Sequence, residues 1–278
     1  MRRTHSDGNR EFNPETLALG YGHDPASMSG SVKPPVFLTS TFEFASAAEG
    51  ARYFELAYGL READPGERMG MIYSRLDNPN LHMFEDRMAA WDRTEVGAAF
   101  ASGMAATATI LLAVLRPGDV VLSTAPVYGG THYLLEHVLR DFGIEPHFVE
   151  AGDDAPAAMA RKIDEVGAGR VRALFVETPA NPSLVHTDVA AVSALAARLR
   201  DAGHEAWTIV DNTLLGPVFQ RPGPLGADAV VYSATKFLGG HSDLIAGVAT
   251  GGAELMMRVR GLRSILGTMT TPFNGWLL

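Results

Sequence analysis

The sequence contains no cysteine in 278 residues, and it has no long run of apolar residues. The absence of cysteine excludes disulfide bonds, thiolate metal ligands and a cysteine nucleophile, and we expect no bound metal. A membrane-spanning helix needs about 18 or more consecutive apolar residues, and a signal peptide needs an apolar segment after its basic start. Neither pattern occurs, since the two arginines near the N-terminus precede a polar stretch. We therefore expect a soluble, cytoplasmic protein that does not associate with a membrane.

Positive charge is also scarce in this chain. The formal net charge is −9, and the only lysines are Lys33, Lys162 and Lys236. A nucleic-acid partner would require a basic surface, so nucleic acid is not expected to bind. Hydrophobic residues at 46% and charged residues at 20% are close to globular averages, which excludes a disordered or fibrous chain. Any chemistry that requires a lysine amine has three candidates.

From residue 84 onward, helical patterns alternate with short apolar runs of strand length. The expected helices cover 84–91, 104–115, 131–142, 156–166 and 189–199. The expected strands cover 96–100, 120–122, 146–149, 171–176, 207–210 and 229–232. Strands this apolar, separated by helices, indicate an α/β fold with a parallel or mostly parallel sheet and helices on both faces.

The first 75 residues differ from the rest, because they show no sustained hydrophobic period. We expect residues 1–75 to form an N-terminal arm with one or two short helices, which packs on a neighbouring subunit. Residues 76–270 would form the large α/β domain. A chain of this length can fold as one large domain or two smaller ones.

Polar residues follow five of the expected strands, and in such sheets ligands bind beyond the carboxyl ends of the strands. These residues lie at 102–104, 128–130, 177–182, 211–212 and 233–236. Each group alone has an ordinary explanation. Ser102 can cap a helix, Tyr128 can pack in a loop, Asp211 can form a structural salt bridge, and Lys236 can be a solvated loop residue.

Pyridoxal 5′-phosphate (PLP) is one ligand that accounts for all five groups together. A helix start and nearby hydroxyls suit its phosphate, and a tyrosine can stack on its ring. An aspartate suits the pyridinium nitrogen, and a lysine amine forms a Schiff base with the aldehyde. Desolvation beyond an apolar strand would favour the free, nucleophilic amine of Lys236.

A set of motifs also resembles those of the Cys/Met-metabolism PLP enzymes, a family that includes cystathionine γ-synthase, the cystathionine lyases and methionine γ-lyase. The motifs occur in family order and are Tyr73-Ser74-Arg75 with Asn78-Pro79, Ser102-Gly103-Met104, Tyr128-Gly129-Gly130-Thr131, Glu177-Thr178-Pro179-Ala180-Asn181-Pro182, Asp211-Asn212-Thr213, and Ser233-Ala234-Thr235-Lys236-Phe237 with Gly239-Gly240-His241-Ser242-Asp243. The resemblance covers nearly the whole chain. It implies the PLP-dependent transferase fold of type I, with a sheet of the seven-stranded type.

The resemblance also implies a role for each matching residue. Lys236 would hold the cofactor and move protons, Asp211 would keep the ring nitrogen protonated, and Tyr128 would stack on the ring; these three would be the catalytic residues. The remaining cofactor-binding residues would be Ser102, Gly103, Met104, Ser233 and Thr235 around the phosphate, Asn181 at the ring hydroxyl, and Tyr73 and Arg75. By resemblance, Tyr73 and Arg75 reach the phosphate of a neighbouring subunit, so a homodimer or homotetramer is expected.

Two departures from the family pattern bear on activity. Methionine γ-lyases usually carry a cysteine at the position of Gly130, which favours an enzyme that handles cystathionine. The family also continues into a C-terminal α/β domain that supplies an arginine for the substrate carboxylate. Residues 271–278 would be only the start of that domain.

The sequence thus predicts a PLP-dependent trans-sulfuration enzyme acting on a small sulfur-containing amino acid, with replacement of the cystathionine γ-synthase type as the first choice. The alternatives are cystathionine γ-lyase, methionine γ-lyase and a non-catalytic PLP-binding remnant. The spacing of Ser233 and Lys236 also matches the S-x-x-K of penicillin-recognising acyl enzymes. That interpretation is disfavoured because no K-T-G motif is present.

Overall fold

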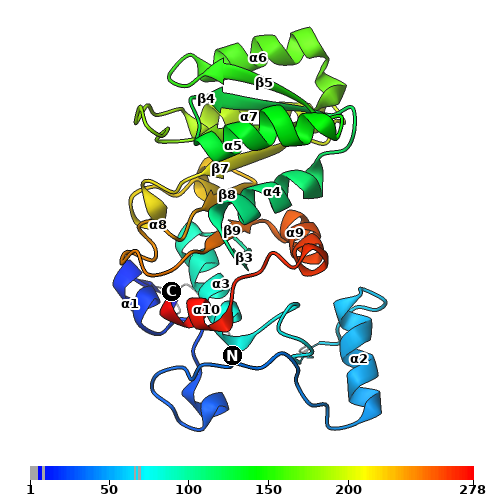
Figure 1. Ribbon diagram of the computed structural model, residues 1–278, viewed down its shortest axis with the longest axis vertical. Helices are drawn as coiled ribbons and strands as arrows, with labels where there is room; N and C mark the ends of the chain where they lie inside the picture. The colour runs from blue at the N-terminus through cyan, green and yellow to red at the C-terminus, as the bar shows by residue number, and fades with distance from the viewer. Residues whose placement is uncertain (1–5, 8–9, 66, 68–69) are drawn as a thin grey trace.

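The computed structural model of this chain describes residues 6–7, 10–65, 67 and 70–278, so the first five residues of the predicted arm lie outside the described residues. Its centre is a seven-stranded sheet in the order β3-β9-β8-β7-β6-β4-β5 (Figure 1). The strands are β3 (Val96–Phe100), β4 (Val120–Ala125), β5 (Glu145–Glu150), β6 (Val171–Glu177), β7 (Trp207–Asp211), β8 (Ala229–Tyr232) and β9 (Gly247–Gly251). A separate pair, β1 (Ser6–Asp7) and β2 (Arg10–Glu11), is antiparallel.

Six of the seven strands run in one direction. Neighbouring strands from β8 through β7, β6 and β4 to β5 pair in parallel. Only β9 is reversed, and it pairs antiparallel with both β3 and β8. This confirms the predicted α/β fold with a mostly parallel sheet. The prediction missed β9, because its short Gly-Val-Ala-Thr-Gly sequence has too few large apolar residues to mark a strand, although it is buried along its whole length.

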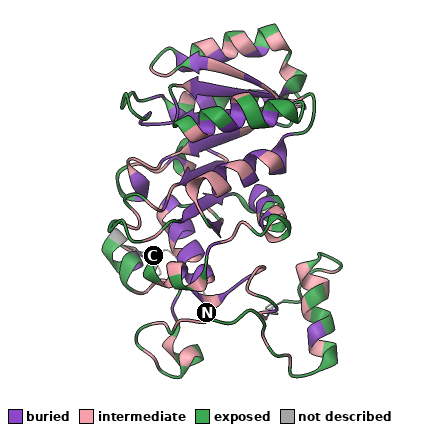
Figure 2. Cartoon of the chain, viewed as in Figure 1, coloured by how far each residue is buried: buried purple, intermediate pink, exposed green. Residues whose placement is uncertain are grey.

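Helices cover both faces of the sheet, and alternate strand residues point to opposite faces. Val121 belongs to a core formed with α4, η2 and α9, whereas Val120 and Leu122 belong to a core formed with α6 and α7. A third core packs α3 against β8 and β9. Figure 2 shows the buried residues concentrated in the strands. The bounds are α3 (Pro79–Asp92), α4 (Gly103–Val114), α5 (Gly129–Tyr133), the π-helical η2 (Leu134–Leu139), α6 (Ala155–Val166), α7 (Val189–Asp201) and α9 (Ala253–Leu266).

Local signals explain where these helices begin and end. The Asp188 side chain accepts the Ala191 N–H at 3.0 Å and so caps α7, as its position before the apolar periodicity suggested. Pro117 follows the end of α4, where it cannot continue a helix. No helix among the described residues combines the length and apolarity needed to cross a bilayer.

The described residues up to Arg75 lie outside the sheet, and Figure 1 shows α2 standing apart from it. Between 12 and 75 the buried described residues are Leu17, His23, Gly50 and Ile72. The helices of this arm are α1 (Pro14–Gly20), the 3-10 turn η1 (Pro25–Met28) and α2 (Ala47–Ala57). Little apolar surface is removed from water within the chain, so packing of the arm on a neighbouring subunit stays a prediction.

The C-terminal residues form a short helix that lies against α3 and the arm (Figure 1). Trp276 donates its indole N–H to the Pro34 carbonyl at 2.8 Å, and the Lys33 ammonium lies 4.0 Å from the centre of the Trp276 ring. The remaining short elements are η3 (Ala168–Arg170), α8 (Gly216–Phe219), η4 (Gly223–Leu225) and this α10 (Pro272–Leu277).

A buried ion pair joins α9 to α3. The exposed fractions of Arg263 and Glu85 are 0% and 1%. The Arg263 guanidinium donates to a Glu85 carboxylate oxygen, to the Ala99 carbonyl at 3.0 Å and to the Leu76 carbonyl at 3.2 Å. The second Glu85 oxygen lies 3.3 Å from the Arg260 guanidinium. These contacts tie α9, α3, β3 and the segment that follows the arm into one unit.

We expect Arg263→Met to lower the free energy of unfolding by about 3–5 kcal/mol, because it removes the fully buried partner of Glu85 and leaves only Arg260 beside that buried carboxylate. Urea unfolding followed by circular dichroism measures this loss. Arg258→Met is a matched control on the same helix, since Arg258 pairs at the surface with Glu205 and Glu254. Surface pairs contribute about 0–1 kcal/mol. Equal losses in the two variants would contradict the role assigned to the buried pair.

Candidate active site

The carboxyl ends of β6, β7 and β8 meet at one edge of the sheet. Glu177 at the end of β6 is the register partner of Asp211 at the end of β7, and Asp211 is the partner of Val231 in β8. Ser233 follows β8 directly. Parallel pairing therefore brings together residues that the sequence placed at separate strand ends, as expected for a ligand site in this class of sheet.

The start of α4 faces Ser233 across this edge. Ser102 caps the helix by accepting the Ala105 N–H at 3.0 Å, and the N–H groups of Gly103 and Met104 donate to no described residue. A Cβ atom on Gly103 would lie 2.7 Å from the Ser233 Cβ, so only glycine allows this approach. Unpaired N–H groups at a helix start, beside the Ser102 and Ser233 hydroxyls, suit an anionic phosphate.

Thr213 connects Ser233 to Asp211. The Thr213 hydroxyl accepts the Ser233 N–H at 2.8 Å and donates to Asp211 Oδ1 at 2.6 Å, and the Thr213 N–H donates to the same oxygen at 3.0 Å. No described residue donates to the second oxygen, Oδ2. The orientation of the Asp211 carboxylate is thus fixed through one oxygen, and the other is available for a ligand that carries an N–H group.

Two carboxylates lie side by side at this edge without a basic partner. Burial raises the pKa of Asp211, and the Thr213 bonds oppose that shift. Burial likewise raises the pKa of Glu177 to about 7; the N–H groups of Tyr128 and Asn181 lower it, and the charge of Asp211 raises it. Neither forms an ion pair with a described residue. This edge of the sheet therefore favours a ligand with a cationic group, because a nearby positive charge would stabilise the ionised carboxylates of Asp211 and Glu177.

Tyr128 directly precedes α5 and is 49% exposed above the edge. A Cβ on Gly130 would lie 2.7 Å from the Tyr128 ring and 3.0 Å from the Met104 sulfur, so the tyrosine ring and Met104 occupy the space that a side chain at position 130 would need. Gly130 therefore permits this orientation of the tyrosine ring.

Lys236 lies in the turn that follows β8, and its side chain is exposed. Desolvation around this amine stays a prediction for the assembled protein, in which a neighbouring subunit is expected to complete the site. The turn itself is held in place: Thr235 donates its hydroxyl to the Ala246 carbonyl at 3.1 Å and accepts the Ala246 N–H at 3.0 Å. The Thr235 hydroxyl proton is thus already used within the chain. Asn181 is also exposed, beyond the end of β6.

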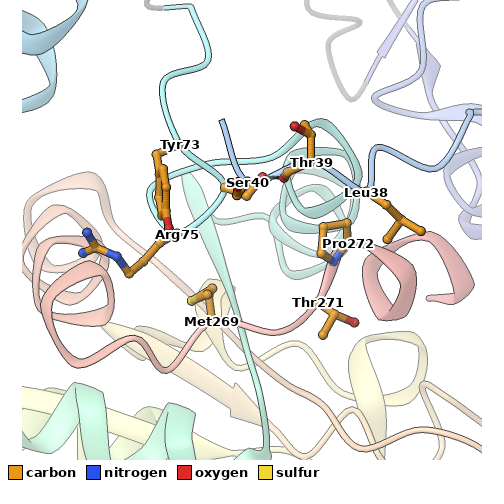
Figure 3. Close-up of a pocket in the computed structure, with 9 residues that line it drawn as sticks. Leu38, Thr39, Ser40, Tyr73, Arg75, Met269, Thr271 and Pro272 are labelled. Carbon is orange, nitrogen blue, oxygen red and sulfur yellow. Dashed lines mark hydrogen bonds between the residues drawn. The ribbon is translucent and has the colours of Figure 1, made fainter. Parts of the chain in front are cut away.

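Tyr73 and Arg75 are engaged elsewhere in the chain. The Arg75 guanidinium donates to the Ser264 carbonyl of α9 and lies 5.5 Å from the centre of the Tyr73 ring. Both residues line a hollow of about 450 Å³ between the arm and the segment before α10 (Figure 3). Its lining is Leu38, Thr39, Ser40, Tyr73, Ser74, Arg75, Met269, Thr271 and Pro272, none of them from the strand ends.

Thr213 and Glu177 occur within the family motifs, but no role was predicted for either from the sequence. Thr213 orients Asp211, and Glu177 accepts the backbone N–H groups of Tyr128 at 2.6 Å and Asn181 at 2.7 Å. A hydroxyl two residues after a carboxylate, and a glutamate at the end of an apolar strand, were the available signals. Neither signal reveals the partner, since the partners come from distant parts of the sequence.

The residues at this edge fit the chemical groups of PLP. The open Asp211 oxygen suits a protonated ring nitrogen, the helix start and the two serine hydroxyls suit a phosphate, and the exposed Tyr128 ring suits stacking. Lys236 is exposed, so its amine is accessible to an aldehyde.

Comparison with known proteins identifies the same group of enzymes. The profile of the family described as Cys/Met metabolism PLP-dependent enzyme matches residues 15–278. An L-methionine gamma-lyase of Pseudomonas deceptionensis is 38% identical over 98% of this chain, and a probable cystathionine gamma-synthase of Herpetosiphon aurantiacus is 35% identical over 95%. The crystal structure of metB from Corynebacterium glutamicum matches with a TM-score of 0.78 and 29% identity, over 96% of this chain.

The chain covers only part of the length of these relatives. The chain spans 64% of the Pseudomonas enzyme, 73% of the Herpetosiphon protein and 63% of the Corynebacterium structure. Within that span the match runs through the arm, the sheet and its strand ends, and it confirms the predicted fold and PLP as the cofactor. The chain belongs to the family of Cys/Met metabolism PLP-dependent enzymes.

Proposed function

We propose that this chain binds PLP at the carboxyl ends of β6, β7 and β8 and serves replacement or elimination at the γ-carbon of a small sulfur-containing amino acid. The observation that carries the proposal is the connected series from the start of α4 through Ser233 and Thr213 to Asp211, with Lys236 in the turn that follows.

Each residue has a separate task at this site. When bound, PLP supplies an electron-accepting ring that stabilises negative charge on the substrate Cα. Asp211 would accept the ring N–H through Oδ2 and keep that nitrogen protonated. Lys236 would hold the cofactor through its amine, and the freed amine would then take the proton from Cα. Tyr128 would stack on the ring, and Asn181 would donate to the ring hydroxyl.

The phosphate would be held at the start of α4. The N–H groups of Gly103 and Met104 and the hydroxyls of Ser102 and Ser233 are the donors that the chain leaves available. Thr235 would join them only by giving up its bond to the Ala246 carbonyl. Tyr73 and Arg75 lie apart from this edge within their own chain, which supports a homodimer or homotetramer in which they serve a neighbouring site.

The first candidate activity is replacement of the cystathionine γ-synthase type. Gly130 supports it, since this position lacks the cysteine that methionine γ-lyases usually carry and a side chain there would meet the Tyr128 ring. Methionine γ-lyase is the second candidate, because two Pseudomonas relatives of that name are each 38% identical to this chain. A Coxiella burnetii relative named cystathionine beta-lyase is 33% identical.

Borohydride reduction tests the lysine assignment directly. Reduction of the PLP-loaded protein fixes the cofactor to the amine that holds it, and peptide mass spectrometry then locates the label. We expect the label on Lys236. Lys33 and Lys162 are internal controls in the same sample, and a label on either of them would contradict the assignment.

We expect Asp211→Asn to slow turnover by about 100-fold, equivalent to roughly 3 kcal/mol, because a neutral amide cannot stabilise a protonated ring nitrogen. The amide oxygen can still accept both Thr213 bonds, so the thermal unfolding midpoint should change little. Asp188→Asn is the matched control, since asparagine caps a helix as well as aspartate does. Turnover within about threefold of the wild type would exclude Asp211 as the ring-nitrogen partner.

Product analysis distinguishes the two candidate activities. Replacement would join cysteine to an activated homoserine ester, giving cystathionine and releasing the carboxylic acid. Elimination from methionine would take up one water and give methanethiol, ammonia and 2-oxobutanoate. We expect the first reaction to be at least about tenfold faster at equal substrate concentration, a difference of about 1.4 kcal/mol in the barrier. Faster release of methanethiol would select the second candidate instead.

A further inference from the structure

Glu177 is the last residue of β6, and only 4% of it is exposed. On one side its N–H donates to the Thr124 hydroxyl of β4 at 3.3 Å, and on the other side Asp211 of β7 is its register partner. A carboxylate in such a place is costly unless hydrogen bonds compensate for the lost water. The groups that compensate it therefore indicate what Glu177 does.

Each oxygen of Glu177 accepts one backbone N–H from a different segment. Oε2 accepts the Tyr128 N–H at 2.6 Å, and Oε1 accepts the Asn181 N–H at 2.7 Å. The first segment follows β4 and the second follows β6. Hydrogen bonds to an ionised acceptor are short and about twice as strong as neutral ones. One carboxylate thus links two loops that emerge from neighbouring strands.

The side chains of these two segments depend on that link. Tyr128 and Asn181 are both exposed, and neither side chain forms a hydrogen bond with a described residue. The places of the tyrosine ring and the asparagine amide above the edge are therefore set by their backbones, and Glu177 holds both backbones.

We propose that Glu177 is a positioning residue, which fixes the Tyr128 and Asn181 segments at the separation that lets both side chains reach the cofactor ring. What those side chains do rests on the proposed function, whereas the link is made by atoms of this chain alone. Glutamine at position 177 would keep one acceptor oxygen but direct an NH₂ group at the other amide. It would therefore break one of the two bonds.

Ionisation of Glu177 should make the hydrogen bonds to Tyr128 and Asn181 depend on pH. Burial raises the pKa of Glu177 to about 7, the N–H groups of Tyr128 and Asn181 lower it, and the Asp211 charge raises it. Asp211 is the charged group that faces it from β7, and Thr124 on β4 carries no charge. Because both amides bond to a group that titrates near neutrality, their NMR signals should move together with pH.

The amide experiment uses the full chain without cofactor, labelled with ¹⁵N-tyrosine, of which the chain has 7. We expect the Tyr128 signal, identified by its loss in Tyr128→Phe, to titrate with a midpoint near 7, and to stop titrating in Glu177→Gln. A Tyr128 signal with the same pH dependence in the wild type and in Glu177→Gln would overturn the proposal, because the Tyr128 amide would then not sense the Glu177 carboxyl.

The functional experiment measures the dissociation constant of PLP by fluorescence quenching. We expect Glu177→Gln to weaken PLP binding by about tenfold, since one of the two segments is released and its ring contact loses its alignment. Thr178→Val is the matched control: Thr178 is the next residue, it is 1% exposed, and its hydroxyl accepts the Thr187 N–H at 3.0 Å in the same loop. This variant loses a buried hydrogen bond but neither Glu177 bond, so its PLP affinity should stay within about twofold of the wild type while its unfolding midpoint falls.

Equal weakening of PLP binding in Glu177→Gln and Thr178→Val would overturn the proposal. It would mean that Glu177 contributes only to the general stability of the loop. If Glu177→Gln does not fold, Glu177→Asp takes its place, since the shorter side chain reaches one amide and the same loss is expected. The proposed function fails separately, through borohydride labelling at a lysine other than Lys236. That outcome would leave the amide titration and its interpretation unchanged.

Discussion

Parallel pairing of β8, β7, β6 and β4 is the constraint on which the site depends. The carboxyl ends of parallel strands lie at the same edge of the sheet, so strand pairing alone brings together residues that are far apart in sequence. Glu177 and Asp211 are 34 positions apart by number but are register partners at the ends of β6 and β7. The single reversed strand, β9, lies between β3 and β8 and leaves this edge intact.

The electrostatics of the edge follow from this arrangement. Two carboxylates are brought together with their pKa values raised by burial, and the described residues place no basic group beside them. The first is satisfied by backbone N–H groups and the second by Thr213, through one oxygen only. The remaining acceptor, a nearby helix start with unpaired N–H groups and an exposed lysine amine are complementary to a cofactor with a cationic ring and an anionic phosphate.

Much of this could be predicted from the sequence. Apolar runs bounded by helical periodicity located six of the seven sheet strands, and the polar residue after each strand located Asp211, Ser233 and Lys236. The pattern could not reveal β9, whose small residues are buried for reasons of tertiary packing. Nor could it reveal the partners of Glu177 or the exposure of Lys236, because both depend on how distant segments meet in space.

The contacts between the arm and the C-terminal helix likewise could not be predicted from the sequence. The lack of periodicity before residue 76 predicted a segment with little core of its own, and its residues are mostly exposed in the chain. The contact between Trp276 and Lys33, which links the C-terminal helix to the arm, leaves no periodic signal in the sequence.

A crystal structure of the chain soaked with PLP tests the central claim most directly. The account predicts continuous density from Lys236 Nζ to the cofactor, the ring nitrogen within hydrogen-bond distance of Asp211 Oδ2, and the phosphate at the start of α4 beside Ser233. Cofactor density that lies away from the carboxyl ends of β6, β7 and β8, with Asp211 Oδ2 uncontacted, would contradict it.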